Sequence, residues 1–472
     1  MTLLNLYHRM PAWGRSVAAS VRGVYLQNWR YGGDTDSLVE RALERETWSP
    51  ARWRSWQDER LGFILHRAAT NVPYYRQSWA KRRRLGYKGS WELLENWPIL
   101  EKDHLRSNGR ALIADDANPR RMFHDCSSGS TGTPVNLSFS RKTLHAWYAL
   151  FEARWRRWCG VSRFDRWAIL GGQIVTPTGQ TKPPFWVWNA GMRQLYMSSY
   201  HLAPGYIPHY LDALERYGIR YLWGYSSSLY SLAQGALQSG RSGMRMRVAI
   251  ANAEPLLDHQ REVIAAAFQC PVKETYGMTE MVAAASECEH GTLHLWPEIG
   301  RLEIEGDEDS LPGQRTGEMI ATGLCNVDMP LIRYRIGDRA SLPLDTVDCA
   351  CGRTLPILAR IEGRSDDLLF TKDGRTIGRL DPVFKGKFLL QEAQIIQESL
   401  TSVRLRYVPA PGCTEQQVRA MVGQIRARMG DVRVQTECVP AIPRGSNNKF
   451  RAVVCNLPSE QRRSLLQTRA VL

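Results

Sequence analysis

Residues 127–134 read Ser127-Ser128-Gly129-Ser130-Thr131-Gly132-Thr133-Pro134, and the organisation of the chain is best read outward from them. A segment with two glycines and five hydroxyl residues offers little apolar surface to a core. Its backbone N–H groups and hydroxyls can instead surround phosphate oxygens, because glycine permits positive φ. The lysine and adjoining Ser or Thr of a Walker A loop are missing. The segment therefore indicates either a phosphate-binding loop of another class or a solvated polar loop.

Downstream of this loop, short apolar runs alternate with helical segments. Strands are expected at 219–223, 248–250 and 271–276, with a helix that Ser226 caps and that runs to about Gln238, and a second helix from Asp258 to Phe268. Strands separated by helices of this length predict a parallel sheet covered by helices, and the expected fold class is α/β. Ligands collect at the carboxyl ends of such strands. Three turns are expected there, at 224–225, at 252–255 and at Gly277.

The pattern changes beyond residue 366. A hairpin is expected at 368–377, followed by a strand near 403–408, a helix near 414–429 and a strand near 431–439. This order predicts a small α+β domain. The expected division is a basic helical N-terminal extension over 1–90 that packs on the large domain, a large domain over 91–365, and a small domain over 366–472.

Charge is distributed unevenly along the chain. The formal net charge is +15, and residues 1–90 hold 16 Lys and Arg against 7 Asp and Glu. Such a surface favours polyanions, among them nucleotides and acidic lipid headgroups. The spacings of zinc fingers, RNP motifs and basic zippers are absent, so nucleic acid is not an expected partner. Ten cysteines in 472 residues do not suggest a disulfide framework, which favours a reducing cytoplasm.

An apolar stripe lies near the N-terminus. Trp13, Val17, Val21 and Tyr25 fall on one helical face. Two interpretations are open: the stripe packs on its own domain, or it rests on a membrane surface, which would place the protein at the inner face of the membrane. No apolar run reaches the roughly 18 residues that a membrane span requires.

Four further segments follow the 127–134 loop in order. They are Tyr276-Gly277-Met278-Thr279-Glu280, Arg333-Tyr334-Arg335-Ile336-Gly337-Asp338, Gly363-Arg364-Ser365-Asp366-Asp367, and residues 443–451 around Lys449. Each is weak alone. Their order and spacing together resemble the adenylate-forming superfamily, which includes acyl-CoA ligases, peptide-synthetase adenylation domains and luciferases, over roughly 120–455.

Finer features narrow this resemblance. Val72-Pro73-Tyr74-Tyr75, the Glu287-Cys288 to His294 segment, residues 329–334 and Cys349-x-Cys351-Gly352-Arg353 resemble the phenylacetate–CoA ligase branch. The Tyr-Gly-Gly triplet at 31–33 and the segments 380–384 and 394–397 resemble CapK-type proteins of capsular and exopolysaccharide loci. The resemblance implies a large domain with helix-covered sheets and a small mobile α+β C-terminal domain.

The resemblance also implies a site for ATP and Mg²⁺. The 127–134 loop would hold the β- and γ-phosphates, Thr279 would bond a phosphate oxygen, and Glu280 would hold Mg²⁺, a hard cation suited to carboxylates. Tyr276 would stack on adenine, and Asp338 would accept from the ribose hydroxyls. The implied nucleotide-binding residues are Ser127, Ser128, Gly129, Ser130, Thr131, Gly132, Thr133, Ala253, Glu254, Tyr276, Gly277, Asp338 and Arg364.

Lys449 would be the catalytic lysine. In the family, a lysine on the small domain bridges the substrate carboxylate and the α-phosphate, a task that suits a compact ammonium with three donors. The glycine usual before it is Asn448 here, and Asn252 replaces a glycine usual beside the adenine. Asp366 matches the hinge about which the small domain swings after adenylation.

Four residues form a candidate zinc site. Cys288, His294, Cys349 and Cys351 offer three thiolates and one imidazole, a set that suits a closed, structural zinc. The alternative is that these are free buried cysteines. Trp223, Tyr225 and Met281 are expected near the acyl pocket, which would suit an aromatic or other apolar acid.

Three functions are compatible with this sequence. The first is ATP-dependent activation of a small carboxylic acid as an acyl-adenylate, followed by thioester formation with CoA. The second passes the acyl group to a sugar or carrier in surface-polysaccharide assembly. The third is a nucleotide-binding scaffold that docks on a membrane assembly. A homodimer is compatible with all three.

Overall fold

The computed structural model describes residues 3–126, 135–177, 179–241, 243–305, 308–311, 313–364, 369–372, 376–377, 389–443 and 451–467. The chain divides into two compact units. Unit 1 comprises Met1–Ile304, Met319–Ile336 and Leu342–Ala359, and unit 2 comprises Glu305–Glu318, Gly337–Ser341 and Arg360–Leu472. The three-part division expected from the sequence is not tested by this grouping and stays a prediction.

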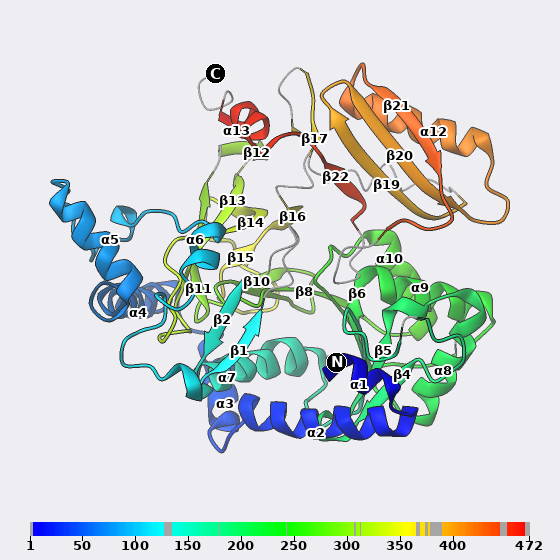
Figure 1. Ribbon diagram of the computed structural model, residues 1–472, viewed down its shortest axis with the longest axis horizontal. Helices are drawn as coiled ribbons and strands as arrows, with labels where there is room; N and C mark the ends of the chain where they lie inside the picture. Colours follow the sequence, from blue (N-terminus) through cyan, green and yellow to red (C-terminus); the bar gives the residue numbers. More distant parts are fainter. Residues whose placement is uncertain are drawn as a thin grey trace. The chain divides into compact units, whose positions relative to one another are not determined.

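A nine-stranded sheet forms the centre of unit 1 (Figure 1), in the order β15-β10-β9-β8-β7-β6-β3-β5-β4. Its middle strands are parallel, and they are β3 (Trp167–Gly171), β5 (Gln194–Ser198), β6 (Tyr221–Tyr225), β7 (Ala249–Asn252) and β8 (Val272–Gly277). Antiparallel strands extend it on both sides, namely β4 (Trp186–Asn189), β9 (Ala284–Glu287), β10 (Leu293–Leu295) and β15 (Ile357–Leu358). The α/β class with a helix-covered sheet is therefore confirmed.

Successive residues of each strand point to opposite faces of the sheet, so side chains on both faces pack against other elements. Leu222 joins a core with α8 (Ile207–Arg216), α9 (Ser226–Gln238) and α10 (Asp258–Phe268). The next residue, Trp223, points away from that core and stacks on Phe151 with ring centroids 4.9 Å apart. Phe151 begins a π-helical turn, Phe151–Arg156, that continues α7 (Arg141–Leu150).

The N-terminal region is helical, with α1 (Leu3–Arg9), α2 (Ala12–Arg30), α3 (Thr35–Arg45), α4 (Pro50–Asn71) and α5 (Pro73–Arg84), and α6 (Lys102–Ser107) follows. α2 lies against β4, where the Ser20 hydroxyl donates to the Trp188 carbonyl at 3.3 Å and accepts from the Ala190 amide at 3.0 Å. Within the described part of the chain, no helix has the length and apolar character needed to cross a bilayer.

Two further sheets come earlier in the sequence than the C-terminal sheet of unit 2. β1 (Phe123–Cys126) pairs with β2 (Asn136–Phe139). A five-stranded sheet has the order β11 (Gly300–Glu305), β13 (Gln314–Gly323), β14 (Tyr334–Pro343) and β16 (Arg360–Arg364), with β12 (Glu308–Leu311) paired to β13.

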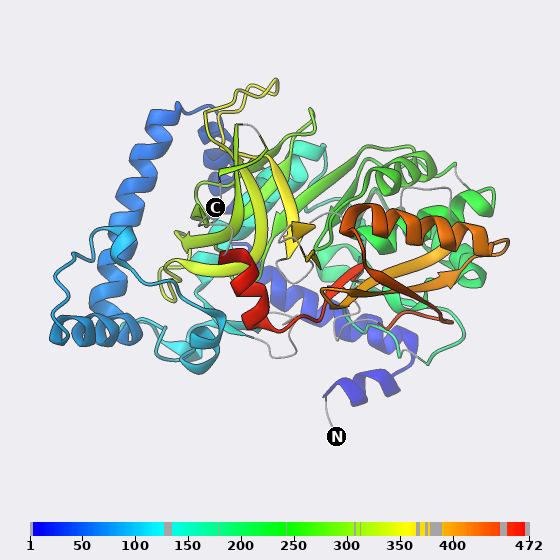
Figure 2. The same cartoon turned by 90° about the horizontal axis from the view of Figure 1, so that it is seen from above.

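The C-terminal part of unit 2 is the expected small α+β fold (Figure 2). Its sheet has the order β21 (Arg433–Cys438), β20 (Ser402–Pro409), β19 (Leu390–Ser399) and β22 (Val453–Cys455). α12 (Glu415–Met429) buries Met421 and Ile425 in a core with Ile395 and Leu405. β17 (Leu369–Phe370) and β18 (Thr376–Ile377) form the predicted hairpin, and α13 (Ser459–Gln467) follows β22.

Candidate nucleotide and metal sites

Three of the predicted site elements cannot be located. Residues 127–134, Asp366 and Lys449 lie outside the described residues. Their phosphate-binding, hinge and catalytic roles stay predictions.

The turns predicted to hold nucleotide lie at one edge of the unit 1 sheet. Tyr225 ends β6, Ala253 and Glu254 follow β7, and Gly277 ends β8. These three strands are adjacent and parallel, so their carboxyl ends meet at the same edge (Figure 1). The structure thus brings together predicted site residues, from Tyr225 to Gly277, that lie some fifty residues apart in the sequence.

Glu254 has a structural partner that the sequence did not predict. Its carboxylate accepts a hydrogen bond from the Ser227 amide at 3.0 Å, and its carbonyl accepts one from the Ser226 hydroxyl at 3.1 Å. Ser226 is the first residue of α9 rather than its cap, so the expectation that Ser226 caps the helix is wrong. A carboxylate at the exposed amides of a helix N-terminus satisfies them and complements the helix dipole. The turn after β7 is thereby fixed to the start of α9.

Asn252 also has a defined role. With its amide oriented to satisfy both neighbours, it donates to the Gly224 carbonyl at 2.9 Å and accepts from the Trp223 indole at 3.0 Å. Trp223 is only 3% exposed. The residue that departs from the family pattern therefore holds Trp223 in the aromatic layer, and a role for Trp223 in an acyl pocket stays a proposal.

Tyr276 and Met281 are buried on either side of the 277–280 turn. The Tyr276 hydroxyl donates to the Met319 sulfur at 3.7 Å. Met281 has φ of 53°, in the left-handed region that side chains rarely adopt. Burial raises the pKa of the neighbouring pocket candidate, Tyr225, to about 12.

Glu280, the predicted magnesium ligand, is a buried carboxylate. Its Oε1 accepts a hydrogen bond from the Tyr334 hydroxyl at 3.1 Å, and Tyr334 is itself fully buried at the start of β14. A hydroxyl donor orients the carboxylate without neutralising it, which fits a ligand for a hard cation. Tyr334 was not predicted as a site residue, although it lies within the 333–338 motif segment.

In unit 2, the two predicted ribose contacts are register partners. Asp338 on β14 lies opposite Arg364 on β16 in the register of an antiparallel pair. The roles of Asp338 at the ribose and of Arg364 at ribose or phosphate stay predictions.

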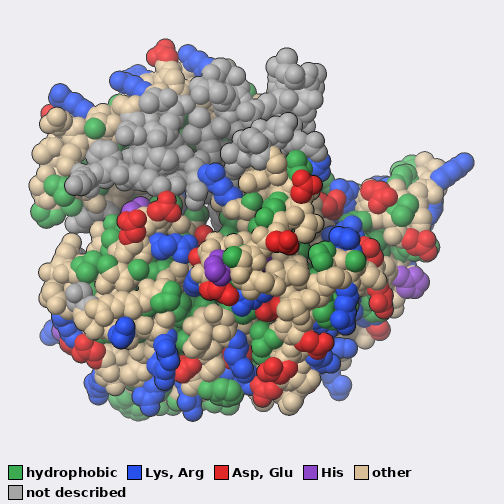
Figure 3. All heavy atoms as spheres, turned by 180° about the vertical axis from the view of Figure 1, so that it is seen from behind, with side chains coloured by type: hydrophobic (Ala, Val, Ile, Leu, Met, Phe, Trp, Pro, Cys, Tyr) green, Lys and Arg blue, Asp and Glu red, His purple; other side chains and the backbone are tan. Residues whose placement is uncertain are grey.

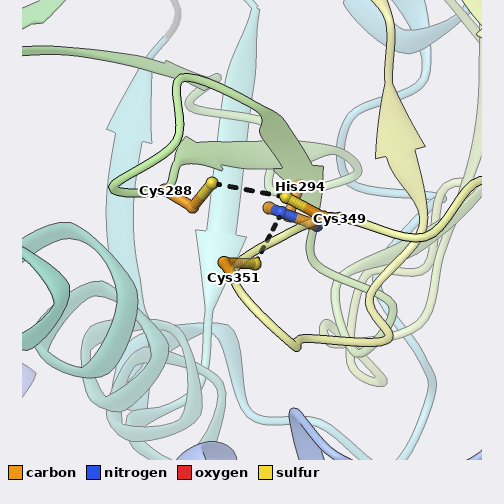
Figure 4. Close-up of side chains that lie close together, drawn as sticks. All are labelled: Cys288, His294, Cys349 and Cys351. Carbon is orange, nitrogen blue, oxygen red and sulfur yellow. Dashed lines mark hydrogen bonds between the residues drawn. The ribbon is translucent and has the colours of Figure 1, made fainter.

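The four predicted zinc ligands converge (Figure 4). One ligand atom from each of Cys288, His294, Cys349 and Cys351 lies within 4.8 Å of every other. Cys288 follows β9, His294 is on the neighbouring β10, and the two remaining cysteines come from the loop before β15. Because β10 pairs with both β9 and β15, strand pairing brings the halves together across more than 50 residues.

The orientation of His294 suits metal binding. Its Nδ1 is 3.2 Å from the Leu355 carbonyl, and its Nε2 is 3.4 Å from the Cys351 sulfur. A proton on Nδ1 satisfies the carbonyl and leaves the Nε2 lone pair facing the thiols, as in histidine ligands held by a backbone acceptor. The Cys288 and Cys349 sulfurs are 3.7 Å apart. The donor set and its geometry fit a tetrahedral zinc.

A buried ionic network adjoins this cluster. Arg353, two residues after Cys351, donates to Glu46 at 3.1 Å. Glu46 also accepts from the Arg154 Nε at 3.5 Å, and Arg154 makes a bidentate pair with Glu298 at 2.8 and 2.9 Å. Burial raises the pKa of Glu46, while the two arginines oppose that shift. The network joins the end of α3, the π-helical turn and the cysteine loop.

The fold is similar to that of known proteins. The chain matches the crystal structure of 2-hydroxyisobutyryl-CoA ligase in the postadenylation state, with a TM-score of 0.66 over 91% of this chain and 94% of that one, at 21% identity. The chain has the adenylate-forming fold. Residues 369–456 match the family described as CapK C-terminal domain.

Sequence comparison agrees with the fold. The chain is 23% identical over 467 residues to Protein CapK of Staphylococcus aureus, covering 96% of this chain and 100% of CapK. It is 26% identical over 369 residues to the phenylacetate-coenzyme A ligase of Pseudomonas putida, covering 71% of this chain and 76% of that enzyme. The resemblance inferred from motif order is therefore confirmed.

Proposed function

We propose that this protein activates a carboxylic acid with ATP as an acyl-adenylate and then passes the acyl group to CoA. The observation that carries the proposal is the adenylate-forming fold combined with the complete order of motifs from 127 to 451. The similarity to acid–CoA ligases supports CoA as the acceptor. The identity of the acid is left to experiment.

Each residue has a proposed part in this reaction. Lys449 would hold the substrate carboxylate and α-phosphate together, and the 127–134 loop would hold the outer phosphates. Mg²⁺ would supply charge neutralisation on the phosphates, and Glu280, oriented by Tyr334, is the carboxylate that would hold it. The carboxyl edge of β6, β7 and β8 would receive adenine and the acyl group.

A second acceptor is supported by one specific observation. The likeness to CapK spans 96% of the chain, and the small domain over 369–456 matches the CapK family. As the alternative to CoA, we propose transfer to a sugar or carrier in surface-polysaccharide assembly, with the reaction in the cytoplasm, because the sequence resembles CapK-type proteins of capsular and exopolysaccharide loci.

We propose a structural rather than catalytic role for zinc at Cys288, His294, Cys349 and Cys351. These four side chains would fill all the positions of a tetrahedral zinc, which would leave none open for substrate. Nothing in adenylation requires a second metal of this kind.

The test is pyrophosphate release from Mg-ATP in the presence of hydroxylamine, run against aryl, fatty and amino acids. Hydroxylamine captures an acyl-adenylate whatever the natural acceptor is. We expect release that depends on one class of acid and falls by at least about 100-fold in Lys449→Ala, since a preorganised charge on the reacting groups is worth that much. Lys372→Ala, an exposed lysine of the same unit, is the matched control.

Adding CoA or a sugar amine to the active pair then separates the two acceptors. If no acid in the panel stimulates pyrophosphate release while ATP still binds, the ligase is rejected in favour of a nucleotide-binding scaffold. Failure to bind ATP would reject the nucleotide site itself.

A further inference from the structure

The outer face of α2 is an exposed apolar surface, which we call the α2 face. It consists of Trp13, Val17, Val21, Val24 and Tyr25. Trp13 is 73% exposed and Val21 is 67% exposed. Along a helix these positions recur every three or four residues, so they form one stripe about 18 Å long. The interpretation that this stripe packs on its own domain is therefore wrong.

The opposite side of α2 is the one that packs. Arg15 and Gly23 are buried there. The Ser16 hydroxyl accepts from the Trp188 amide at 3.2 Å, and Ser20 bonds to Trp188 and Ala190. A Cβ at Gly191 would stand 2.5 Å from the Val24 amide nitrogen, so helix and loop are in close contact. The α2 face is thus held outward on a fixed helix.

The stretch of sequence that carries the α2 face contains only positive charge. Residues 1–33 contain four arginines and no Asp or Glu. Arg22 is exposed on α2, on the flank away from the α2 face, since it follows the buried Arg15 by two helical turns. At the other end of the stripe, the Tyr25 ring is 6.5 Å from Phe123, and the exposed Arg121 and Asp125 each lie two residues from Phe123. The Arg141 guanidinium lies over the Trp29 ring at 4.6 Å.

These features favour a lipid surface over a protein groove. Trp13 and Tyr25 stand near the two ends of the stripe, valines lie between them, and arginines border it. Aromatic residues and arginines of this kind settle at the headgroup level of an anionic bilayer, while the aliphatic side chains enter its apolar boundary. On the face seen from behind in Figure 3, by contrast, basic, acidic and hydrophobic side chains are interspersed.

We propose that the α2 face docks the protein on an anionic membrane surface. α2 would lie parallel to the bilayer plane, with its valines in the acyl boundary, Arg121 among the headgroups and Arg22 on the flank of the helix. This proposal is independent of the ligase reaction, because none of these residues belongs to the candidate nucleotide site.

The test is sedimentation of the full-length protein with extruded vesicles, either of phosphatidylcholine alone or with about a third phosphatidylglycerol. We expect binding to the anionic vesicles that weakens as salt rises. Trp13→Ser/Val17→Ser/Val21→Ser should abolish it. Arg22→Gln/Arg121→Gln should weaken it by up to about 25-fold at low salt, since an arginine within a Debye length of an anionic surface contributes at most about fivefold. Leu344→Ser/Val347→Ser, at exposed apolar positions elsewhere, is the control that should bind like the unaltered protein.

Two results would overturn the proposal. One is binding that is absent in the unaltered protein or unchanged in the triple serine variant. The other is a concentration-dependent dimer in light scattering that the triple variant dissociates, which would assign the α2 face to a second copy of the chain. Far-UV circular dichroism and thermal unfolding of each variant establish that it is folded. The vesicle test does not depend on ligase activity.

Discussion

Arg154 illustrates how individual buried charges hold unit 1 together. Its guanidinium, fully removed from solvent, meets both Glu298 and Glu46. Removing one member of such a network leaves the other charges buried without a partner. We expect Arg154→Met to lower the free energy of unfolding by about 3–5 kcal/mol. Urea unfolding measures it, with Arg76→Met as control, because the Arg76–Asp115 pair is half exposed and is worth at most about 1 kcal/mol.

Tyr334 and Glu280 allow a second prediction at the scale of one hydrogen bond. Tyr334→Phe fits the same buried space but removes the donor to the Glu280 carboxylate. We expect a loss of about 1–2 kcal/mol in stability, and a higher magnesium concentration for half-maximal pyrophosphate release. An unchanged magnesium dependence would show that Tyr334 does not position Glu280. Tyr75→Phe controls for loss of a buried tyrosine hydroxyl, because the Tyr75 hydroxyl donates to the Pro330 carbonyl and accepts from the Ile332 amide.

At the scale of elements, the hairpin of β9 and β10 and the loop before β15 depend on each other through the cysteine cluster. We expect one zinc per chain by elemental analysis of the purified protein. Cys351→Ser or His294→Ala should lose the metal and lower the unfolding temperature by several degrees, because the loop then has no ligand to hold it. Cys270→Ser, a buried cysteine outside the cluster, should retain the metal. Retention of zinc in both ligand variants, or its absence from the unaltered protein, would reject the site.

Elements differ in how well local sequence predicts them. α10 has the predicted bounds, Asp258–Phe268, because its apolar spacing and flanking turns are local signals. β19 (Leu390–Ser399) was not predicted, since its polar residues obscure the alternation that marks a strand. It becomes a central strand because β20 and β22 pair with it on both sides. Pairing partners distant in sequence provide no local signal.

At the scale of the whole molecule, buried tyrosines make stability depend on alkaline pH. Burial raises the pKa of Tyr225 to about 12, and it raises the pKa values of Tyr75, Tyr196, Tyr210 and Tyr221 further. A folded-state pKa above the unfolded value near 10 stabilises the protein fully below pH 10, and this contribution is lost as pH rises through 10 to 12. Each buried tyrosine adds up to about 1.4 kcal/mol per pH unit to that loss.

Urea unfolding followed by intrinsic fluorescence between pH 8 and 11.5 measures this dependence. We expect stability to be flat near pH 8–9 and to fall steeply above pH 10. Tyr225→Phe should reduce the slope, and Tyr25→Phe, at an exposed position, should not. A stability that rises above pH 10 would contradict the assignment of burial as the cause.

The order of motifs and the choice of residue types were enough to predict the adenylate-forming fold, the four cluster residues and the turns of the candidate nucleotide site. Such features are local, because glycine, carboxylate, thiol and apolar spacing each impose chemistry on a few neighbouring residues. Only tertiary structure placed Tyr334 against Glu280, Glu254 at the start of α9, and Asn252 against Trp223. It also turned the apolar stripe of α2 outward, since β4 and the 190–192 turn bind the other side of the helix. Which face of an amphipathic helix is covered depends on partners far away in the chain, and its own sequence does not contain that information.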